Sequence, residues 1–382
     1  MAENRSREWK AFMKNGTAQL EQLLKAISVI PAPSGSEEKR AEFVKKWLEA
    51  QGAEGVYIDE AKNVIFPMNC DGRKDITVFA AHTDVVFPDE KELPWREDDK
   101  NFYCPGVGDN TVCLATMLTV IKFILQNQIK PLGAVLFVAN ACEEGLGNLK
   151  GTRRLFEDYK GRITRFYTFD GQYQAVVSRC VGSHRYEVSC ATEGGHSYNA
   201  FGNHNAIALL ADFISDLYTI QVPKKENCKT TYNVGVISGG TSVNTIAQRA
   251  SMLFEYRSDD AACLAKMEKA FQEKLAAANA SGKGIFRAAL VGARPCQEKI
   301  DERVHQAMVD RTRAIQEEES GQEVCLCSGS TDCNIPMSLG VPAVCVGVYN
   351  GGGAHTYEEW VEKASLPIGL RIVHRLVSDY FS

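Results

Sequence analysis

The sequence predicts an α/β protein that carries an inserted α+β domain of the ferredoxin type. Strands alternate with helical segments in the first half of the chain, and the same alternation returns near its carboxyl end. Between these parts the order changes to strand, helix, strand, strand, helix, strand, which is typical of a split βαβ sandwich. We therefore expect one domain from residues 1–181 and 293–382, and a second domain from residues 182–292.

The amino-terminal elements follow from the spacing of apolar residues. Residues 20–50 have helical spacing that Pro31 and Pro33 interrupt, so we expect a helix, a loop and a helix. Runs rich in β-forming residues then predict three strands, at residues 55–59, 63–68 and 75–81. Residues 112–126 predict a buried helix, and the nearly continuous apolar run at residues 133–140 is typical of a strand covered on both faces.

The inserted segment and the carboxyl-terminal part complete the predicted order. Alternating runs predict four strands, at residues 185–191, 232–238, 250–257 and 284–291. Two helices interleave with these strands, at residues 206–217 and 260–278. Beyond Pro295 the pattern predicts a helix at 301–318, strands at 324–327 and 343–348, and a closing helix at 366–380.

Composition and charge exclude several classes of protein. A net charge of −5 without any basic run argues against a nucleic-acid partner. The polar start of the chain lacks the apolar region of a secretory signal, and no window reaches eighteen consecutive apolar residues. Thirteen cysteines stand singly in apolar runs, so we interpret them as reduced core thiols. We expect a cytoplasmic protein with no membrane partner.

Polar side chains gather where predicted strands end or a helix begins. They are His82 and Asp84, Asp109, Glu143 and Glu144, Asp170, and His355. Each has an ordinary explanation alone, because an Asp before a helix is usually a cap and adjacent glutamates usually form a solvated turn. In open α/β sheets, however, sites form at the carboxyl ends of strands. Two histidines and five carboxylates at such positions predict a metal site.

The ligand types indicate which metal ions this site would hold. A pair of divalent cations can polarise a carbonyl group and lower the pKa of a water molecule. Imidazole and carboxylate suit Zn²⁺, with Co²⁺ or Mn²⁺ as alternatives, whereas a structural zinc more often uses closely spaced cysteines. In the segment from His82 to Asp84, the period of two along a strand lets Asp84 orient the ring of His82.

Seven short stretches resemble the M20 family of co-catalytic metallopeptidases, especially its peptidase T-like members. They are residues 81–84 (AHTD), 106–110 (GVGDN), 142–147 (CEEGLG), 169–171 (FDG), 194–197 (GGHS), 239–244 (GGTSVN) and 353–356 (GAHT). The resemblance extends over almost the full length of the chain. It implies a phosphorylase/hydrolase-like catalytic domain and an inserted lid and dimerisation domain, and hence a homodimer.

The same resemblance implies a role for each candidate residue. Asp109 would bridge two metal ions, His82 and Asp170 would complete one site, and Glu144 and His355 would complete the other. Glu143 would be the general base. In the inserted domain, His196 would stabilise the oxyanion, and the substrate would be held by Asn244 and Arg257. Arg257 suits a carboxylate because its guanidinium group can bind both oxygens at once.

The expected function is hydrolysis of short peptides, foremost the removal of the amino-terminal residue of tripeptides. Three alternatives stay open: an N-acyl amino acid deacylase, a dipeptidase or carboxypeptidase, and a metal- or peptide-binding protein without turnover. A general base such as Glu143 favours an enzyme. A dinucleotide site at residues 145–151 is disfavoured because two glutamates precede it, and Cys142 is a weak candidate nucleophile because a lone cysteine in such a strand is normally part of the core.

Overall fold

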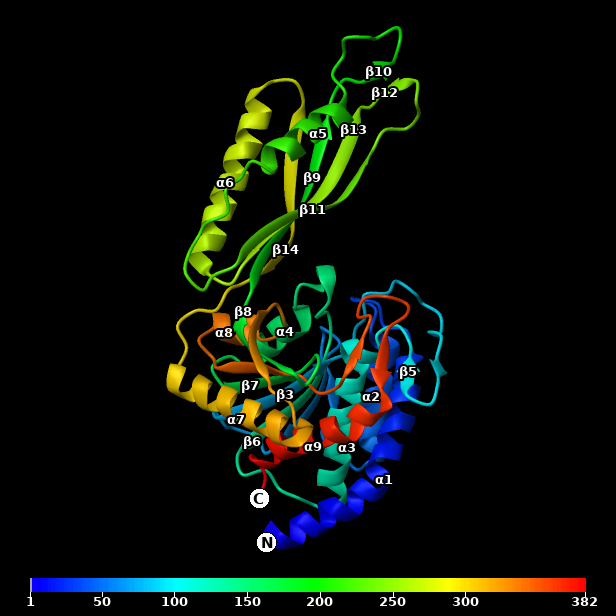
Figure 1. Ribbon diagram of the computed structural model, residues 1–382, viewed down its shortest axis with the longest axis vertical. Coiled ribbons are helices and arrows are strands. Elements are labelled where there is room, and N and C mark those ends of the chain that lie inside the picture. The colour runs from blue at the N-terminus through cyan, green and yellow to red at the C-terminus, as the bar shows by residue number, and fades with distance from the viewer. Residues whose placement is uncertain (1) are drawn as a thin grey trace. The chain divides into compact units, whose positions relative to one another are not determined.

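The computed structural model describes residues 2–382, and their side chains from residue 8 onward. The chain forms two compact units (Figure 1). The main unit contains the residues up to Arg179 together with Glu298–Ser382, and the inserted unit is Cys180–Gln297. Each unit is described by itself below.

The main unit is built on a mixed sheet that has eight strands within the described part of the chain. Its order is β1 (Tyr57–Ile58), β2 (Val64–Met68), β6 (Ala134–Asn140), β3 (Ile76–His82), β7 (Ile163–Phe169), β16 (Ala343–Val346), β8 (Ala175–Cys180) and β15 (Cys325–Gly329). Strands β6, β3, β7 and β16 run parallel to their neighbours in this group, while β1, β2 and β8 pair antiparallel. The parallel centre brings the carboxyl ends of four strands to one edge of the sheet.

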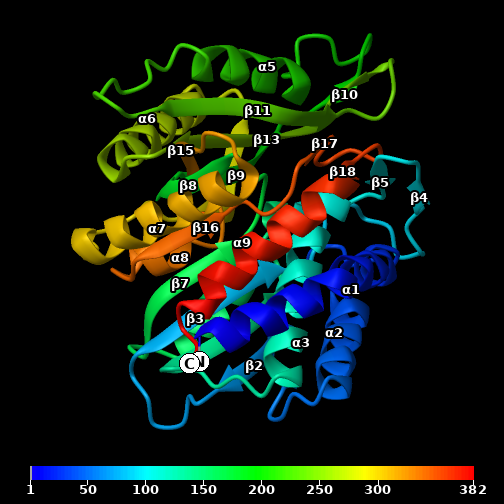
Figure 2. The same ribbon diagram turned by 60° about the horizontal axis from the view of Figure 1, so that its bottom comes forward.

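Helices cover both faces of this sheet, which explains why its central strands are apolar throughout. Helices α1 (Ala2–Ser28), α3 (Cys113–Gln126) and α9 (Leu366–Ser378) lie side by side (Figure 2). Phe79, Tyr167 and Phe169 face this layer and stack on one another. Phe166 points to the opposite face, where its ring meets Phe156 of α4 (Lys150–Asp158). Alternate residues of each strand therefore serve two separate cores.

The remaining helices of the main unit pack around this framework. Helix α2 (Glu38–Ala50) lies against β1 and β2, α7 (Glu302–Ser320) against α9 and β16, and α8 (Asn334–Ser338) against α4. The segment Val107–Gln126, which includes α3, is apolar and long enough to cross a membrane, but its most apolar window is 89% buried. Packing in the core explains that composition. On helix α7, His305 is buried, and its Nε2 lies 3.0 Å from the Ser178 carbonyl oxygen.

A small sheet connects two loops that carry candidate ligands. It contains β17 (Gly351–Gly352), β18 (Trp360–Glu362), β5 (Asn101–Tyr103) and β4 (Arg96–Glu97), in that order. Strand β18 pairs with β5 at one side and with β17 at the other, so the segment before Asp109 and the segment around His355 are held next to each other.

The inserted unit has the predicted order of strands and helices, and the predicted fold class is confirmed. The elements are β9 (Gly182–Ala191), α5 (Ala206–Leu217), β11 (Thr230–Gly239), β13 (Arg249–Ser258), α6 (Ala261–Ala280) and β14 (Ile285–Arg294). The strands form an antiparallel sheet in the order β11-β13-β9-β14. Val188, Phe254 and Tyr256 point to one face and pack against Phe213 of α5 and Phe271 of α6. A short ribbon, β10 (Gly195–His196) with β12 (Thr245–Ile246), completes the unit.

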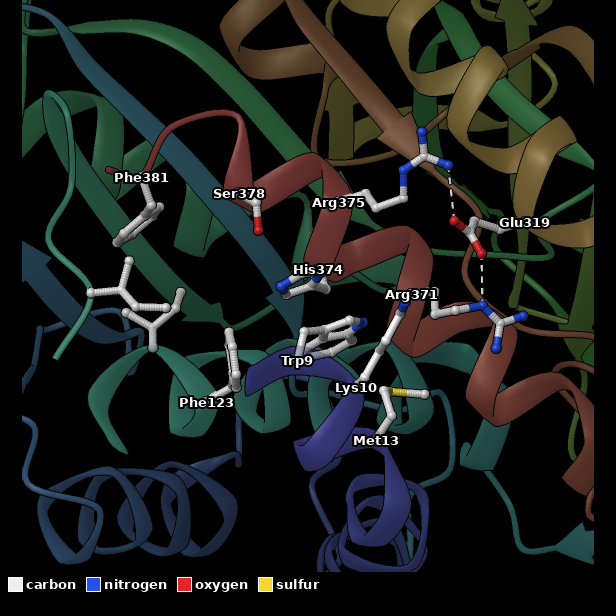
Figure 3. A pocket seen from close by; sticks show the side chains of 12 residues that line it. Trp9, Lys10, Met13, Phe123, Glu319, Arg371, His374, Arg375, Ser378 and Phe381 are labelled. Atoms are coloured by element: carbon white, nitrogen blue, oxygen red, sulfur yellow. Dashed lines mark hydrogen bonds and ion pairs between the residues drawn. The ribbon is translucent and has the colours of Figure 1, made fainter. Parts of the chain in front are cut away.

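The helix layer of the main unit has an open pocket of about 630 Å³ between α1, α3 and α9 (Figure 3). Inside it, the imidazole of His374 stacks on Trp9 with ring centroids 3.5 Å apart. Glu319 accepts hydrogen bonds from Arg371 at 2.6 Å and from Arg375 at 2.8 Å. Burial lowers the pKa of His374 to about 3, and the charge of Arg375 acts in the same direction. The ring is therefore neutral at physiological pH.

This shift predicts a loss of stability in mild acid. An unfolded histidine titrates near 6.5, so below that pH the unfolded chain binds a proton that folded His374 does not accept. The contribution of neutral His374 to the free energy of unfolding is fully present above pH 6.5 and is lost as the pH falls towards 3. The variant His374→Phe can keep the stack on Trp9 but has no group that titrates there. Between pH 7 and pH 5, we expect the free energy of unfolding of the wild type to fall by up to about 2 kcal/mol more than that of the variant. Urea unfolding followed by circular dichroism measures this difference. Equal losses in both proteins would show that His374 accepts its proton in the folded state.

Candidate metal centre

The predicted ligands of the main unit meet at the carboxyl edge of the parallel strands. His82 ends β3, the pair Glu143 and Glu144 follows β6, and Asp170 follows β7. Because β6, β3 and β7 are neighbours in the sheet, these side chains converge at one place. His355 reaches the same place from the loop between β17 and β18.

Ligand atoms form two groups that share Asp109. The first contains His82, Asp109 and Asp170, and the second contains Asp109, Glu144 and His355, each with its ligand atoms within 4.8 Å of one another. Oδ1 of Asp109 lies 3.0 Å from Nε2 of His82, and Oδ2 lies 3.1 Å from Nε2 of His355. Each group offers one imidazole nitrogen and two carboxylates, a donor set that fits a divalent cation such as Zn²⁺.

The backbone of the Asp109 loop is held by Glu359, a residue that the sequence analysis missed. The buried Glu359 carboxylate accepts hydrogen bonds from the amides of Gly106 at 2.7 Å, Gly108 at 3.0 Å and Asp109 at 2.7 Å. Gly106 has a φ of 75°, and a Cβ atom there would lie 2.3 Å from Val85, so the tight turn requires glycine. The peptide bond between Asp109 and Asn110 is cis.

Asp84 organises the other side of the centre. Its carbonyl oxygen lies 3.1 Å from Nδ1 of His82, so that Nε2 of the ring faces Asp109. The fully buried Asp84 carboxylate accepts hydrogen bonds from the amides of Glu143 and Glu144, each at 2.9 Å, and from the Ser34 hydroxyl at 2.6 Å. Burial alone would raise the pKa of Asp84, but His82 and these donors hold it below its ordinary value. Asp84 thus fixes His82 and both glutamates together.

The electrostatics of the centre favour positive charge. Burial, followed by the neighbouring Asp109 charge, raises the pKa of Asp170 well above its ordinary value. Burial raises the pKa of Glu144 to about 7, with the charges of Asp109 and Glu143 adding to it. Hydrogen bonds to Asp109 and Glu144 raise the pKa of His355 to about 10. A cation at these positions would relieve the repulsion among the carboxylates.

Three further predicted residues lie in the inserted unit. His196 is exposed on β10, and its Nδ1 accepts weak hydrogen bonds from the amides of residues 198 and 199, at 3.3 and 3.4 Å. Asn244 is exposed before β12 and accepts a hydrogen bond from Ser242 at 2.7 Å. Arg257 donates to both oxygens of Glu255, at 2.8 and 3.0 Å. The roles implied for these residues stay predictions.

Cys142 does not have the surroundings of a nucleophile. Its thiol is buried and donates to Oε1 of Glu37 at 3.3 Å. Burial raises the pKa of Cys142 to about 12, and the Glu37 charge acts in the same direction. Since the thiolate is the reactive form, the thiol is unreactive at neutral pH. Residues 145–147 form a short 3₁₀ turn, and α4 begins only at Lys150, so they do not form a phosphate-binding turn at a helix start.

Fold and site together define a two-domain α/β protein with a candidate centre for two cations. The chain belongs to peptidase family M20/M25/M40, whose family model matches residues 78–379. It is 24% identical over 360 residues, 93% of this chain and 96% of the relative, to a Mycobacterium tuberculosis protein named as a succinyl-diaminopimelate desuccinylase. Among solved structures, it resembles the aminopeptidase PepT of Bacillus cereus with a TM-score of 0.70 and 20% identity, over 95% of this chain and 98% of that one. A tripeptidase of Staphylococcus aureus matches with a TM-score of 0.71 and 22% identity, over 94% and 98% of the two chains.

The raised pKa of Glu144 predicts that the cation-free protein becomes less stable as the pH rises. Its folded pKa of about 7 exceeds the ordinary 4.5, so the associated stability is present below pH 4.5 and is lost as the pH rises through 7. In chelated protein, Glu144→Gln should therefore raise the free energy of unfolding at pH 8 by up to about 3 kcal/mol, with no gain at pH 4.5.

Chemical denaturation at the two pH values checks this prediction, with exposed Glu157→Gln on α4 as the matched control. With Zn²⁺ added, the order should reverse, because the variant has lost a ligand and gains less stability from the ion. A chelated Glu144→Gln protein that is no more stable than the wild type at pH 8 would contradict the charge repulsion described above.

Proposed function

We propose that this chain is a metal-dependent exopeptidase that removes the amino-terminal residue of short peptides, foremost tripeptides. The observation that carries the proposal is the position of Glu143. A Glu143 carboxylate oxygen lies within 4.8 Å of ligand atoms of His82 and Glu144, yet Glu143 belongs to neither group that shares Asp109. A carboxylate beside two cation sites, but not needed to complete either, is suited to act as a base.

In this proposal the side chains around Asp109 hold two divalent cations, Zn²⁺ foremost, with Co²⁺ or Mn²⁺ as alternatives. One cation would be held by His82, Asp109 and Asp170, and the other by Asp109, Glu144 and His355. When bound, these ions would polarise the scissile carbonyl group and lower the pKa of a water molecule.

Glu143 would move the proton during the reaction. It accepts a proton as the water oxygen forms its bond to the carbonyl carbon, and it gives that proton to the nitrogen as the C–N bond breaks. The products are a free amino acid and a peptide shortened by one residue. Asp84 supports this role because it binds the amides of Glu143 and Glu144, which keeps the base beside the ligand.

The inserted domain, predicted at residues 182–292, would act as a lid and as a dimerisation module. His196 would stabilise the oxyanion, and Asn244 and Arg257 would bind the substrate. Arg257 supports this assignment because its guanidinium group already binds a carboxylate, that of Glu255, through two hydrogen bonds. A homodimer through this domain is part of the proposal. A cytoplasmic location is supported by the thirteen cysteines, which are all free thiols.

A second candidate is hydrolysis of an N-acyl amino acid, such as an N-succinyl compound. The relative named as a succinyl-diaminopimelate desuccinylase, which aligns with 93% of this chain, favours it. Both reactions break an amide bond with the same water and base, so they differ in what binds on either side of that bond. A dipeptidase would differ in the same way.

The test is turnover by chelated protein that is then reloaded with Zn²⁺, Co²⁺ or Mn²⁺. Tripeptides, dipeptides, amino-terminally blocked peptides and N-succinyl or N-acetyl amino acids are offered separately, and the released amine is measured. Metal-restored cleavage of unblocked tripeptides, with the first residue released, supports the exopeptidase. Turnover of the acylated compounds alone supports the second candidate. Bound metal without turnover of any compound would instead indicate a binding protein.

The role of Glu143 gives a sharper prediction. Glu143→Gln keeps the size of the side chain but cannot take a proton, so we expect kcat to fall by about 10²- to 10⁴-fold. The KM and the number of zinc ions bound should stay close to the wild-type values, as measured by steady-state kinetics and metal analysis. The control is Glu157→Gln, an exposed glutamate on α4 that lines neither group. Normal turnover by Glu143→Gln would show that another residue is the base.

A further inference from the structure

The loop of residues 34–37, which leads into α2, contacts both parts of the protein that hold the candidate base. At its start, the Ser34 hydroxyl donates to Oδ2 of Asp84 at 2.6 Å. At its end, Oε1 of Glu37 accepts hydrogen bonds from the amide of Cys142 at 3.1 Å and from the amide of Gly35 at 2.7 Å. The Glu37 side chain is fully buried. Burying a carboxylate costs free energy unless it is hydrogen-bonded or paired with a cation.

The turn that Glu37 contacts has an unfavourable backbone conformation. Cys142 has a φ of 59°, in the left-handed region that is unfavourable for a residue with a Cβ atom. Both polar hydrogens of Cys142 are directed at Glu37, since its thiol also donates to Oε1, at 3.3 Å. Glycine cannot be replaced at position 147 without a clash, because a Cβ there would lie 2.8 Å from the Cys142 carbonyl oxygen. Packing and hydrogen bonds thus fix the turn from both sides.

Three successive amides of this turn are bound by two buried carboxylates. The amide of Cys142 donates to Glu37, and the amides of Glu143 and Glu144 donate to the two oxygens of Asp84. Hydrogen bonds to a charged acceptor are roughly twice as strong as neutral ones, and burial strengthens them further. The position of the backbone from which Glu143 and Glu144 project is therefore set by Glu37 on one side and by Asp84 on the other.

Lys62 lies beside Glu37, and Arg40 links the start of α2 to the segment before Asp84. Lys62 lies 3.8 Å from Oε2 of Glu37, and it also pairs with exposed Glu38 at 2.6 Å. One turn along α2, the buried Arg40 donates to the carbonyl oxygen of Thr83, the residue before Asp84, at 2.8 Å. Glu37 and Arg40 are three residues apart, so the start of α2 contacts the Cys142 turn through Glu37 and the residue before Asp84 through Arg40.

We propose that Glu37 is a positioning residue for the reaction: it holds the Cys142 turn so that Glu143 and Glu144 reach their working positions. This inference rests on the proposed function, in which Glu143 is the base. It gives a role to a glutamate that contacts neither ligand group directly. A base displaced by about 1 Å can lower the rate by about 100-fold, whereas substrate binding is little changed as long as the cation sites stay filled and the inserted unit is intact.

The test compares three variants of the full-length, metal-loaded protein. Glu37→Ala removes the acceptor, and we expect kcat to fall by about 30- to 100-fold with KM within about twofold of the wild type. Glu37→Gln keeps an oxygen that can accept from the Cys142 amide, so it should recover kcat to within about threefold. Glu38→Gln is the matched control, because it is the adjacent glutamate, shares Lys62 and is exposed, and it should leave kcat unchanged.

A second measurement separates positioning from a loss of folding. Hydrogen exchange of the peptide that contains residues 141–145 should be faster in Glu37→Ala than in the wild type, at a temperature where both remain folded. Wild-type inactivity towards every amide in the panel would overturn the proposed function, while the exchange measurement would still test the turn. An active wild type together with unchanged kcat in Glu37→Ala would overturn this inference and leave the proposed function standing. A parallel rise of KM, or no recovery by Glu37→Gln, would also overturn it.

Discussion

Hydrogen bonds from loop amides to buried carboxylates hold the candidate centre in shape. Glu359 accepts from the amides of the Asp109 loop, including that of Asp109 itself. Asp84 accepts from the amides of Glu143 and Glu144, and Glu37 accepts from that of Cys142. Strand ends can bring loops to one edge of a sheet, but they do not fix a loop to within a few tenths of an ångström. The buried carboxylates fix the loops more tightly, because each is a charged acceptor shielded from solvent.

Binding the loops through buried carboxylates has an electrostatic cost. The anchoring carboxylates lie around a set of ligands that is itself rich in carboxylates, so negative charges accumulate. The raised pKa values of Glu144 and Glu359, each about 7 and each caused first by burial, are the result. Asp332 shows the same effect, since burial and the Glu143 charge raise its pKa to about 6. Cations bound in such a centre would offset this charge, which would couple metal binding to folding.

Much of this architecture could be predicted from the sequence. The apolar runs at β3 and β6 and the polar residues directly after them indicated both the sheet and the place of the candidate ligands, and membership of the M20 family is confirmed. The roles of Glu37 and Glu359 could not be predicted, because no periodicity distinguishes these two residues from exposed glutamates. Glu37 and Glu359 each stand in a pair of glutamates in a polar loop, where one member is exposed and the other is buried. The buried member of each pair differs from the exposed one in its tertiary contacts. These contacts join residues that are 105 to 253 positions apart in the chain.

The residues proposed for substrate binding belong to a different unit from those proposed for the chemistry. Every candidate metal ligand and the candidate base lie in the main unit, whereas Asn244 and Arg257 lie in the inserted unit. In the inserted unit, the Glu255 carboxylate is shared by two arginines, Arg257 on its own strand and Arg185 on the neighbouring strand, at 3.2 Å. In the proposed function Arg257 binds the substrate, so its guanidinium group would have to exchange Glu255 for a carboxylate of the substrate, or share the two carboxylates.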